Sequence, residues 1–232
     1  MERTIKFFLL TALFFCFQNV HALDIEITRA DVDAYLGGNY TRGSHFTGEI
    51  AGIGSVQLNN TIGFRGGLSI GRTLIDTDIN IFVSAEYYPF KKIPLSFSVA
   101  YIYNGLPEYE AHTNSLIPYI SYKAKIAGVS LGFNCRFSSY FGGKAQFESV
   151  LSLYGYINFL NTDKILMGIG CGNLKDFHAN NLGALSLNLF AKIPIAENIA
   201  LINDLEYMQS GMDGLTATLY KVSFRAGVNI SW

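Results

Sequence analysis

The chain has 232 residues, of which 50% are hydrophobic and 15% are charged. Its 17 basic residues nearly balance its 18 acidic ones, so no nucleic acid or other polyanionic partner is expected. Beyond Ala22 no stretch approaches the roughly 18 uncharged apolar residues of a membrane-spanning helix, which excludes the helical membrane proteins.

The N-terminal segment has the three parts of a cleavable signal peptide: a basic start, an apolar run over 7–17 and a small-residue ending at Ala22. The run is shorter than the roughly 20 residues that cross a hydrocarbon core, which argues against an anchor helix. Cys16 follows two phenylalanines where a lipid-attachment site needs small residues, which argues against a lipoprotein. We therefore predict a signal peptide over 1–22 and one mature domain over 23–232.

The rest of the sequence divides into segments of about ten residues in which apolar and polar side chains alternate. These segments predict strands, in chain order, at 29–41, 48–58, 61–71, 78–88, 95–104, 115–125, 127–138, 148–160, 165–174, 182–193, 199–209 and 215–232. This count of about twelve is even, as a closed barrel with both termini on one side requires. Alternation is blurred over 165–174 and 199–209, and 48–58 is rich in glycine, so barrels of eight or ten strands with longer outer loops are the alternatives.

The breaks between the predicted strands form two alternating sets. One set consists mostly of tight turns, such as Asn59-Asn60 and Ala127-Gly128. The other set is on the whole longer and more polar, and lies near 42–47, 72–77, 105–114, 139–147, 175–181 and 210–214. Barrels that are inserted from the periplasm have short periplasmic turns and longer outer loops, so the two sets match that class.

One face of the predicted strands is apolar, as Ile62, Phe64 and Leu68 illustrate. A closed barrel pairs every backbone donor and acceptor between strands, so it can stand in lipid with apolar side chains outward. The sequence therefore predicts an all-β fold, an antiparallel transmembrane β-barrel. Cys135 and Cys171 fall on the apolar face of strands that are not neighbours in the chain, so free, lipid-facing thiols are expected.

The segment 221–232 alternates to its last residue. Its apolar face includes Phe224, Val228, Ile230 and Trp232. It resembles the C-terminal assembly signal of Gram-negative outer-membrane proteins, with tryptophan in place of the commoner phenylalanine. The resemblance implies insertion by the barrel-assembly machinery and a location in the bacterial outer membrane, with outer-membrane lipid around the barrel.

The opposite face of the strands carries charges of both signs, which suit the wall of a hydrated pore or a ladder of ion pairs that holds the barrel round. The candidate lumen-lining residues are Arg29, Asp31, Asp33, Glu49, Arg65, Glu86, Lys123, Lys125, Arg136, Glu148, Lys192, Asp204, Glu206, Lys221 and Arg225. Barrel closure places the last strand between the first and the eleventh, so we predict an acid–base cluster across this seam. The cluster consists of Lys221 and Arg225 with Asp31, Asp33, Asp204 and Glu206.

No catalytic, cofactor-binding or metal-binding site is predicted. His45, His112 and His178 all fall in predicted outer loops, where solvated histidines are expected. Nothing fixes a base beside a nucleophile there, and no hydrolase motif occurs. The glycines of 168–172 lie two residues apart on one side of a strand, and no Lys-Ser or Lys-Thr pair follows them as in a phosphate loop, so they predict a slim stretch of lumen wall.

The leading functional hypothesis is a small channel for small hydrophilic solutes, similar in size and strand number to small twelve-stranded porins. The second hypothesis is a non-conducting surface barrel whose outer loops bind partners. The third is a hydrolase with its site at the barrel rim, like the outer-membrane phospholipases or proteases. The sequence does not show whether a loop folds inward as a plug.

Overall fold

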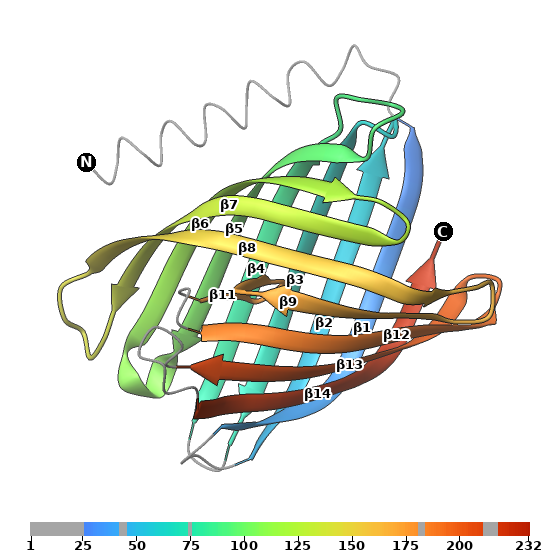
Figure 1. Ribbon diagram of the computed structural model, residues 1–232. Helices are drawn as coiled ribbons and strands as arrows, with labels where there is room; N and C mark the ends of the chain where they lie inside the picture. Colours follow the sequence, from blue (N-terminus) through green and yellow to red (C-terminus); the bar gives the residue numbers. More distant parts are fainter. Residues whose placement is uncertain (1–25, 42–45, 74–75, 181–183, 211–217) are drawn as a thin grey trace.

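The computed structural model describes residues 26–41, 46–73, 76–180, 184–210 and 218–232. Its strands are β1 (Ile27–Thr41), β2 (Thr47–Leu58), β3 (Ile62–Arg72), β4 (Thr77–Tyr87), β5 (Leu95–Leu106), β6 (Ala111–Lys123), β7 (Ala127–Ser139), β8 (Gln146–Asn161), β9 (Leu166–Gly172), β10 (Leu174–Lys175), β11 (His178–Ala179), β12 (Ala184–Ala196), β13 (Ile199–Ser210) and β14 (Thr218–Ser231). Figure 1 shows most of these strands wound into a single tilted barrel.

Within the described residues, twelve of the strands form a closed barrel in the order β1-β14-β13-β12-β9-β8-β7-β6-β5-β4-β3-β2. Neighbouring strands pair antiparallel, and β14 closes the barrel by pairing with β1 from Asp31↔Ser231 to Thr41↔Lys221. The predicted all-β barrel of about twelve strands is confirmed, and the alternatives of eight or ten strands are wrong. The three least regular segments of the prediction correspond to β2, β9 and β13.

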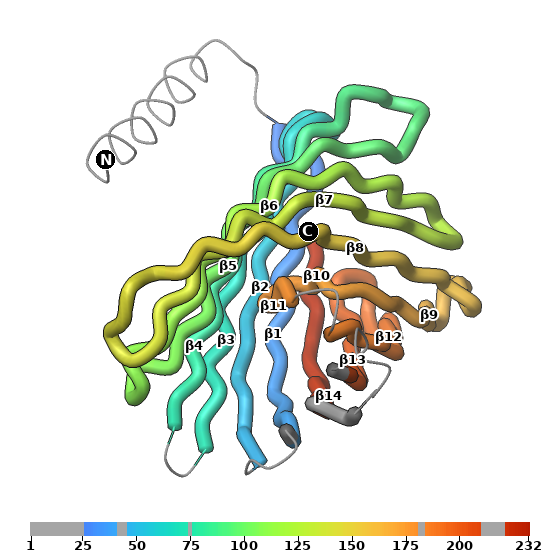
Figure 2. The backbone as a smooth tube through the Cα atoms, turned by 60° about the vertical axis from the view of Figure 1, so that its left-hand side comes forward, coloured from blue at the N-terminus to red at the C-terminus, as the bar shows by residue number. Residues whose placement is uncertain are grey.

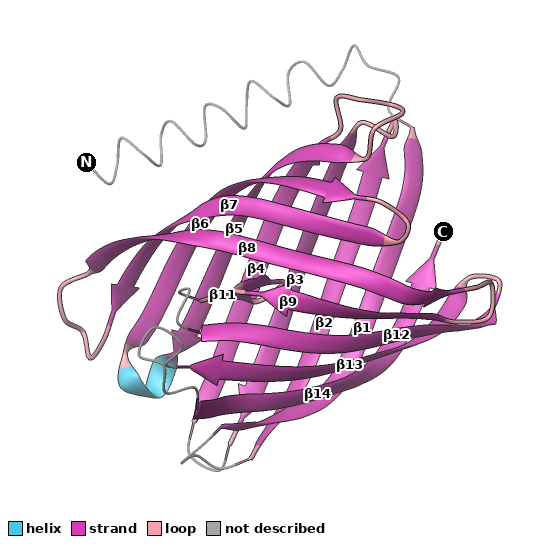
Figure 3. Cartoon of the chain, in the orientation of Figure 1, coloured by secondary structure: helices cyan, strands magenta, loops and turns pink. Residues whose placement is uncertain are grey.

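The predicted and observed strands differ mainly at their ends. β5 and β6 stay paired as far as Leu106↔Ala111, so that only 107–110 remain of the loop predicted over 105–114. A short 3-10 helix, η2 (Pro107–Tyr109), fills this connection and is the helical turn drawn in Figure 3. No helix among the described residues has the length and apolar composition needed to cross a membrane.

The barrel has two unlike ends. We call the end that carries 107–110 and 140–145 the loop end, and the end that carries 124–126 and 197–198 the turn end. The connection between β9 and β12, residues 173–183, also starts from the loop end. It is longer than the others there, and its described part forms the candidate site.

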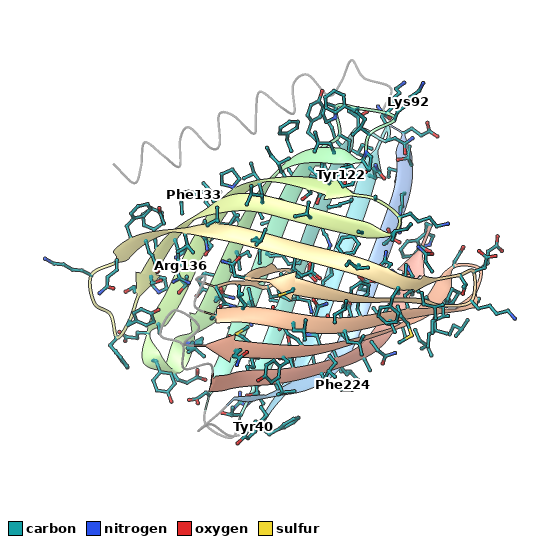
Figure 4. The ribbon with its side chains drawn as sticks, viewed as in Figure 1. Tyr40, Lys92, Tyr122, Phe133, Arg136 and Phe224 are labelled. Carbon is teal, nitrogen blue, oxygen red and sulfur yellow. The ribbon has the colours of Figure 1, made fainter. Side chains whose placement is uncertain are left out.

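Successive side chains of each strand point to opposite sides of the barrel wall. On β4, Ile81 and Val83 are exposed outside while Phe82 is buried inside. Phe133 and Phe224 are also exposed, and Figure 4 shows both on the outer surface. Soluble proteins rarely expose a continuous apolar belt, whereas a transmembrane barrel presents one to lipid.

The two cysteines in the described part of the chain, Cys135 and Cys171, are free, as predicted. They lie on β7 and β9, which β8 separates in the barrel. Cys171 is exposed between the buried Gly170 and Gly172, so its thiol points away from the lumen.

Candidate functional site

The connection between β9 and β12 enters the interior of the barrel. β10 and β11 pair only with each other and form a small sheet separate from the barrel wall. Figures 1 and 2, which differ by a 60° rotation, both show this pair within the ring of strands. We call residues Asn173–Asn180 the inner segment. The sequence predicted an outer loop near 175–181, and the described part of that loop lies inside the barrel instead.

Asn173 anchors the start of the inner segment. Its side-chain oxygen accepts a hydrogen bond from the Leu153 backbone N–H at 2.7 Å. Its side-chain nitrogen donates to the carbonyls of Leu151 at 2.7 Å and Asn180 at 3.0 Å. The Asn180 backbone N–H donates back to the Asn173 carbonyl at 2.8 Å. The two ends of the inner segment are therefore tied to each other, and its start is tied to β8.

Ion pairs join the middle of the inner segment to two separate parts of the wall. Arg65 on β3 pairs with Asp176 at 2.5 Å, and Lys175 pairs with Asp204 on β13. β3 and β13 are separated around the barrel by β2, β1 and β14. The inner segment is therefore held to more than one part of the surrounding wall.

Phe177 is the buried centre of the inner segment, with 1% of its surface exposed. Its ring meets the Phe82 ring edge-on, with centroids 5.2 Å apart and planes at 83°. The Arg225 guanidinium carbon lies 5.6 Å from the Phe177 ring centroid, and the Asn104 side chain donates to the Phe177 carbonyl at 2.7 Å. The ring packs on buried side chains that we call the inner apolar patch: Ala51, Ile53, Phe82, Ala100, Ile102 and Ile117.

Cavities lie on both sides of the inner segment. Towards the loop end, a cavity of about 330 Å³ is lined by Asp78, His178 and Lys221, among others. Towards the turn end, Tyr119 lines a cavity of about 220 Å³, and Arg29 lines one of about 270 Å³. The inner segment therefore divides the interior into a loop-end and a turn-end compartment.

Many of the charged residues predicted to line the lumen pair with one another. The pairs are Arg29–Asp31 at 2.6 Å, Lys123–Glu86 at 2.7 Å, Arg136–Glu148 at 2.5 Å and Arg225–Glu49 at 2.8 Å. Lys192 donates to the Asn229 side chain at 2.7 Å, and Asn229 donates to Asp33 at 2.6 Å. Glu206 is buried with neither carboxylate oxygen hydrogen-bonded, and Lys175 is 4.0 Å away. Opposite charges are thus mostly neutralised locally.

Lys125 does not lie on a strand as predicted. β6 ends at Lys123, and Lys125 is exposed in the turn over 124–126. Its backbone carbonyl accepts hydrogen bonds from the side chains of Asn158 and Asn161. The predicted strand 115–125 was too long, because the tight turn to β7 begins earlier.

The charged residues predicted to form a cluster at the seam pair with other residues instead, so this prediction is wrong. Arg225 is opposite Asp204 in the β13–β14 ladder, yet its ion pair goes to Glu49 on β2. Asp204 instead pairs with Lys175, and Asp31 pairs with Arg29. The inner segment brings Lys175 to Asp204 from a stretch that was predicted to lie outside, so the expected pairing across the seam does not form.

The alternate glycines of β9 face the interior, as predicted, but they do not leave a slim wall. A β-carbon at Gly168 would collide with the Phe190 ring, and one at Gly170 would collide with the Tyr154 hydroxyl. The glycines therefore make room for rings from the two flanking strands, β12 and β8. Sequence spacing gave the direction of the glycines but not the side chains that cover them.

The histidines are placed differently from one another. His178 is on β11 inside the barrel, so its predicted position in an exposed outer loop is wrong. His112 is exposed on β6, with its ring 6.4 Å from that of Tyr103, and His45 lies outside the described residues. Over the described ranges, no group of three or more His, Cys, Asp or Glu is arranged to hold a metal ion.

The inner segment was missed because its position depends on contacts that sequence periodicity does not report. One signal was present: Leu174 and Phe177 are apolar residues within an otherwise polar predicted loop. Large apolar side chains in a loop need a surface to cover them. Here both pack on the inner apolar patch.

The sequence matches no protein-family model and no curated protein. Solved structures of outer-membrane channels share its fold. A KdgM porin in complex with disordered oligogalacturonate has a TM-score of 0.57 and 13% identity, covering 87% of this chain and 99% of its own. The NanC porin has a TM-score of 0.55 and 14% identity, covering 85% and 98%. An outer-membrane channel from Pseudomonas putida F1 has a TM-score of 0.56 and 11% identity, covering 89% and 96%. The chain therefore has the fold of outer-membrane β-barrel proteins.

Proposed function

We infer that the protein is a narrow channel for small hydrophilic solutes in the bacterial outer membrane. The observation that carries this proposal is the interior of the barrel, where cavities of about 330, 220 and 270 Å³ lie on both sides of the inner segment and each is lined in part by charged side chains. A closed barrel with an apolar outer surface and a charged interior is suited to passing water-soluble compounds through lipid. The shared fold with solved porins agrees with this function.

The proposed lumen lining is close to neutral. Arg29, Arg65 and Lys123 at the turn-end side face Asp31, Asp176 and Glu86, each within a described ion pair. Rings of one sign select ions of the other sign, whereas paired charges offer hydrogen bonds with little net field. We therefore expect weak selectivity between cations and anions. No chemical step is part of the proposal, since the lumen residues are assigned to lining and not to catalysis.

Planar-bilayer recording on refolded protein tests the channel. Stepwise single-channel openings, with a reversal potential near zero in a salt gradient, are expected. A folded protein that gives no openings over a range of voltages would contradict the proposal. The folded state is checked in the same preparation by gel migration, because an intact barrel migrates differently before and after boiling.

A non-conducting barrel is the second candidate, and one observation favours it. The inner segment fills the middle of the barrel, and its Phe177 ring is almost completely buried. If this arrangement is permanent, the recording is silent and the outer loops carry the function. The conductance experiment therefore separates the two candidates.

The route to the membrane is also a proposal. Residues 1–22 lie outside the described residues, and we assign them to a signal peptide that is removed to leave a mature domain over 23–232. On β14, the exposed outward side chains Phe224, Val228 and Ile230 are assigned, with Trp232, to recognition by the barrel-assembly machinery. N-terminal sequencing of the membrane-extracted protein should begin at Leu23. A sequence that begins at Met1 would contradict the assignment.

A further inference from the structure

The inner apolar patch is an unexpected surface inside a transmembrane barrel. Interiors of such barrels are polar, because the lumen is filled with water or with a polar plug. Here Ile102 and Ile117 are buried on β5 and β6, and Phe82 is buried on β4 beside them. The patch therefore needs an apolar occupant to keep it from water.

The occupant in the structure is an aromatic ring. Phe177 meets Phe82 edge-on, which is a favourable arrangement of two rings. The Arg225 guanidinium carbon lies 5.6 Å from the Phe177 ring centroid, and that of Arg65 lies 5.4 Å from the Phe82 centroid. Cations at these distances attract the faces of aromatic rings more than they attract saturated groups. The place that Phe177 fills thus suits an aromatic ring in particular.

The chain that carries Phe177 is not part of the barrel wall. The inner segment meets the wall through apolar and polar contacts. Phe177 and Leu174 pack on the inner apolar patch, and Asn173 is hydrogen-bonded to β8. The Arg65–Asp176 and Lys175–Asp204 pairs and the hydrogen bond from Asn104 are further polar contacts. Water can replace polar contacts of this kind, and cavities lie on both sides of the segment. Because β10 and β11 pair only with each other, the ring can leave its place without opening the ladder of the barrel.

We propose that the inner apolar patch, with Phe82 and Arg225, is a binding site for the aromatic ring of a small solute, and that Phe177 occupies this site when no solute is bound. Binding of the solute then displaces Phe177 and with it the inner segment. The proposal rests on the proposed channel function for the solute's path, since the ring must reach the site through the lumen.

Phenol binding to refolded protein in micelles tests the site directly. Phe177→Ala removes the built-in occupant, and Phe133→Ala is the matched control because Phe133 is an exposed phenylalanine on the outer surface. Saturation-transfer NMR of phenol should show saturable binding to Phe177→Ala. The apparent Kd for the wild type and Phe133→Ala should be about tenfold weaker or more, because the site is free only while Phe177 is displaced.

Two further measurements keep the test decisive. Cyclohexanol should bind Phe177→Ala more weakly than phenol, and equal binding of the two would overturn the aromatic assignment. Asn104→Ala loosens the inner segment without altering the patch, so it should tighten phenol binding relative to the wild type even if Phe177→Ala fails to fold. If neither variant binds more phenol than Phe133→Ala, the site does not exist. A barrel that binds phenol but never conducts would contradict only the proposed channel function. A barrel that conducts but does not bind phenol would contradict only the proposed binding site.

Discussion

Replacing Glu49 by glutamine isolates the Arg225 guanidinium inside the barrel. The two side chains are 5% and 7% exposed and share hydrogen bonds of 2.8 and 3.2 Å, and the Ser69 hydroxyl also donates to Glu49. Removing one partner of a buried ion pair typically costs about 3–5 kcal/mol, because the remaining charge stays buried without compensation. Glutamine keeps one oxygen that can accept from Arg225, so we expect the lower end of that range, about 3 kcal/mol.

A double-mutant cycle separates the interaction energy of Glu49 and Arg225 from the contributions of their surroundings. Arg225→Met should cost a similar amount, since it leaves the Glu49 carboxylate with only Ser69 as a described partner. The double variant buries no charge at this position. Its loss in free energy of unfolding should therefore be smaller than the sum of the two single losses by at least about 2 kcal/mol. Equilibrium unfolding in urea from lipid vesicles measures these differences, with gel migration before boiling as the check on folding.

A more exposed pair provides the control. In Arg136–Glu148 the Glu148 side chain is 46% exposed, so Glu148→Gln should cost less than about 1 kcal/mol. If Glu49→Gln costs no more than Glu148→Gln, or if the two losses at Glu49 and Arg225 simply add, the buried pair is not what holds this part of the barrel.

Three other outcomes follow from the outer face and the seam. Leu131→Arg places a charge on the exposed outer surface. It should lower the free energy of unfolding in vesicles by about 2–4 kcal/mol if the residue lies near the bilayer midplane. A loss below about 0.5 kcal/mol would argue that this face does not meet lipid. The exposed Cys171 thiol should react with a lipid-soluble maleimide and resist a charged, membrane-impermeant one, and preferential labelling by the charged reagent would place it in water. Reversing Lys221 and Arg225 to glutamate sets a carboxylate against Glu49, so the folded gel band should disappear; intact heat-modifiable migration would refute a role for these charges in closure.

The barrel could be predicted because lipid and lumen impose opposite chemistry on alternate residues. Ile81 and Val83 face outward and must be apolar, whereas Ser84 faces inward and can be polar. The sequence of each strand therefore shows which of its sides faces lipid. β13 was also placed correctly, at 199–209 against Ile199–Ser210, although its alternation is blurred. Strand ends were less predictable, because the ladder at Leu106↔Ala111 continues through residues of mixed polarity.

The inner segment could not be predicted from the same pattern. Alternation reports which side of a wall a residue faces, but Asp176 and Phe177 belong to no wall. Their place is fixed by side chains far away in the sequence: Arg65 is 111 residues from Asp176, and Asn104 is 73 residues from Phe177. Contacts of this separation depend on the curvature and closure of the whole barrel, which a single segment does not encode.

The seam shows how a residue without a side chain decides which charges meet. Arg225 on β14, Gly37 on β1 and Glu49 on β2 lie in one row across the sheet, since Gly37 is paired with both of the others. Strands two apart are separated by about 9–10 Å, so the Arg225 side chain must pass over the middle strand to reach Glu49. A β-carbon at Gly37 would collide with the Phe224 carbonyl and press on the Arg225 side chain. Glycine normally weakens a strand. Here its absent side chain lets Arg225 on the last strand reach past the first strand to Glu49 on the second, so this ion pair depends on Gly37.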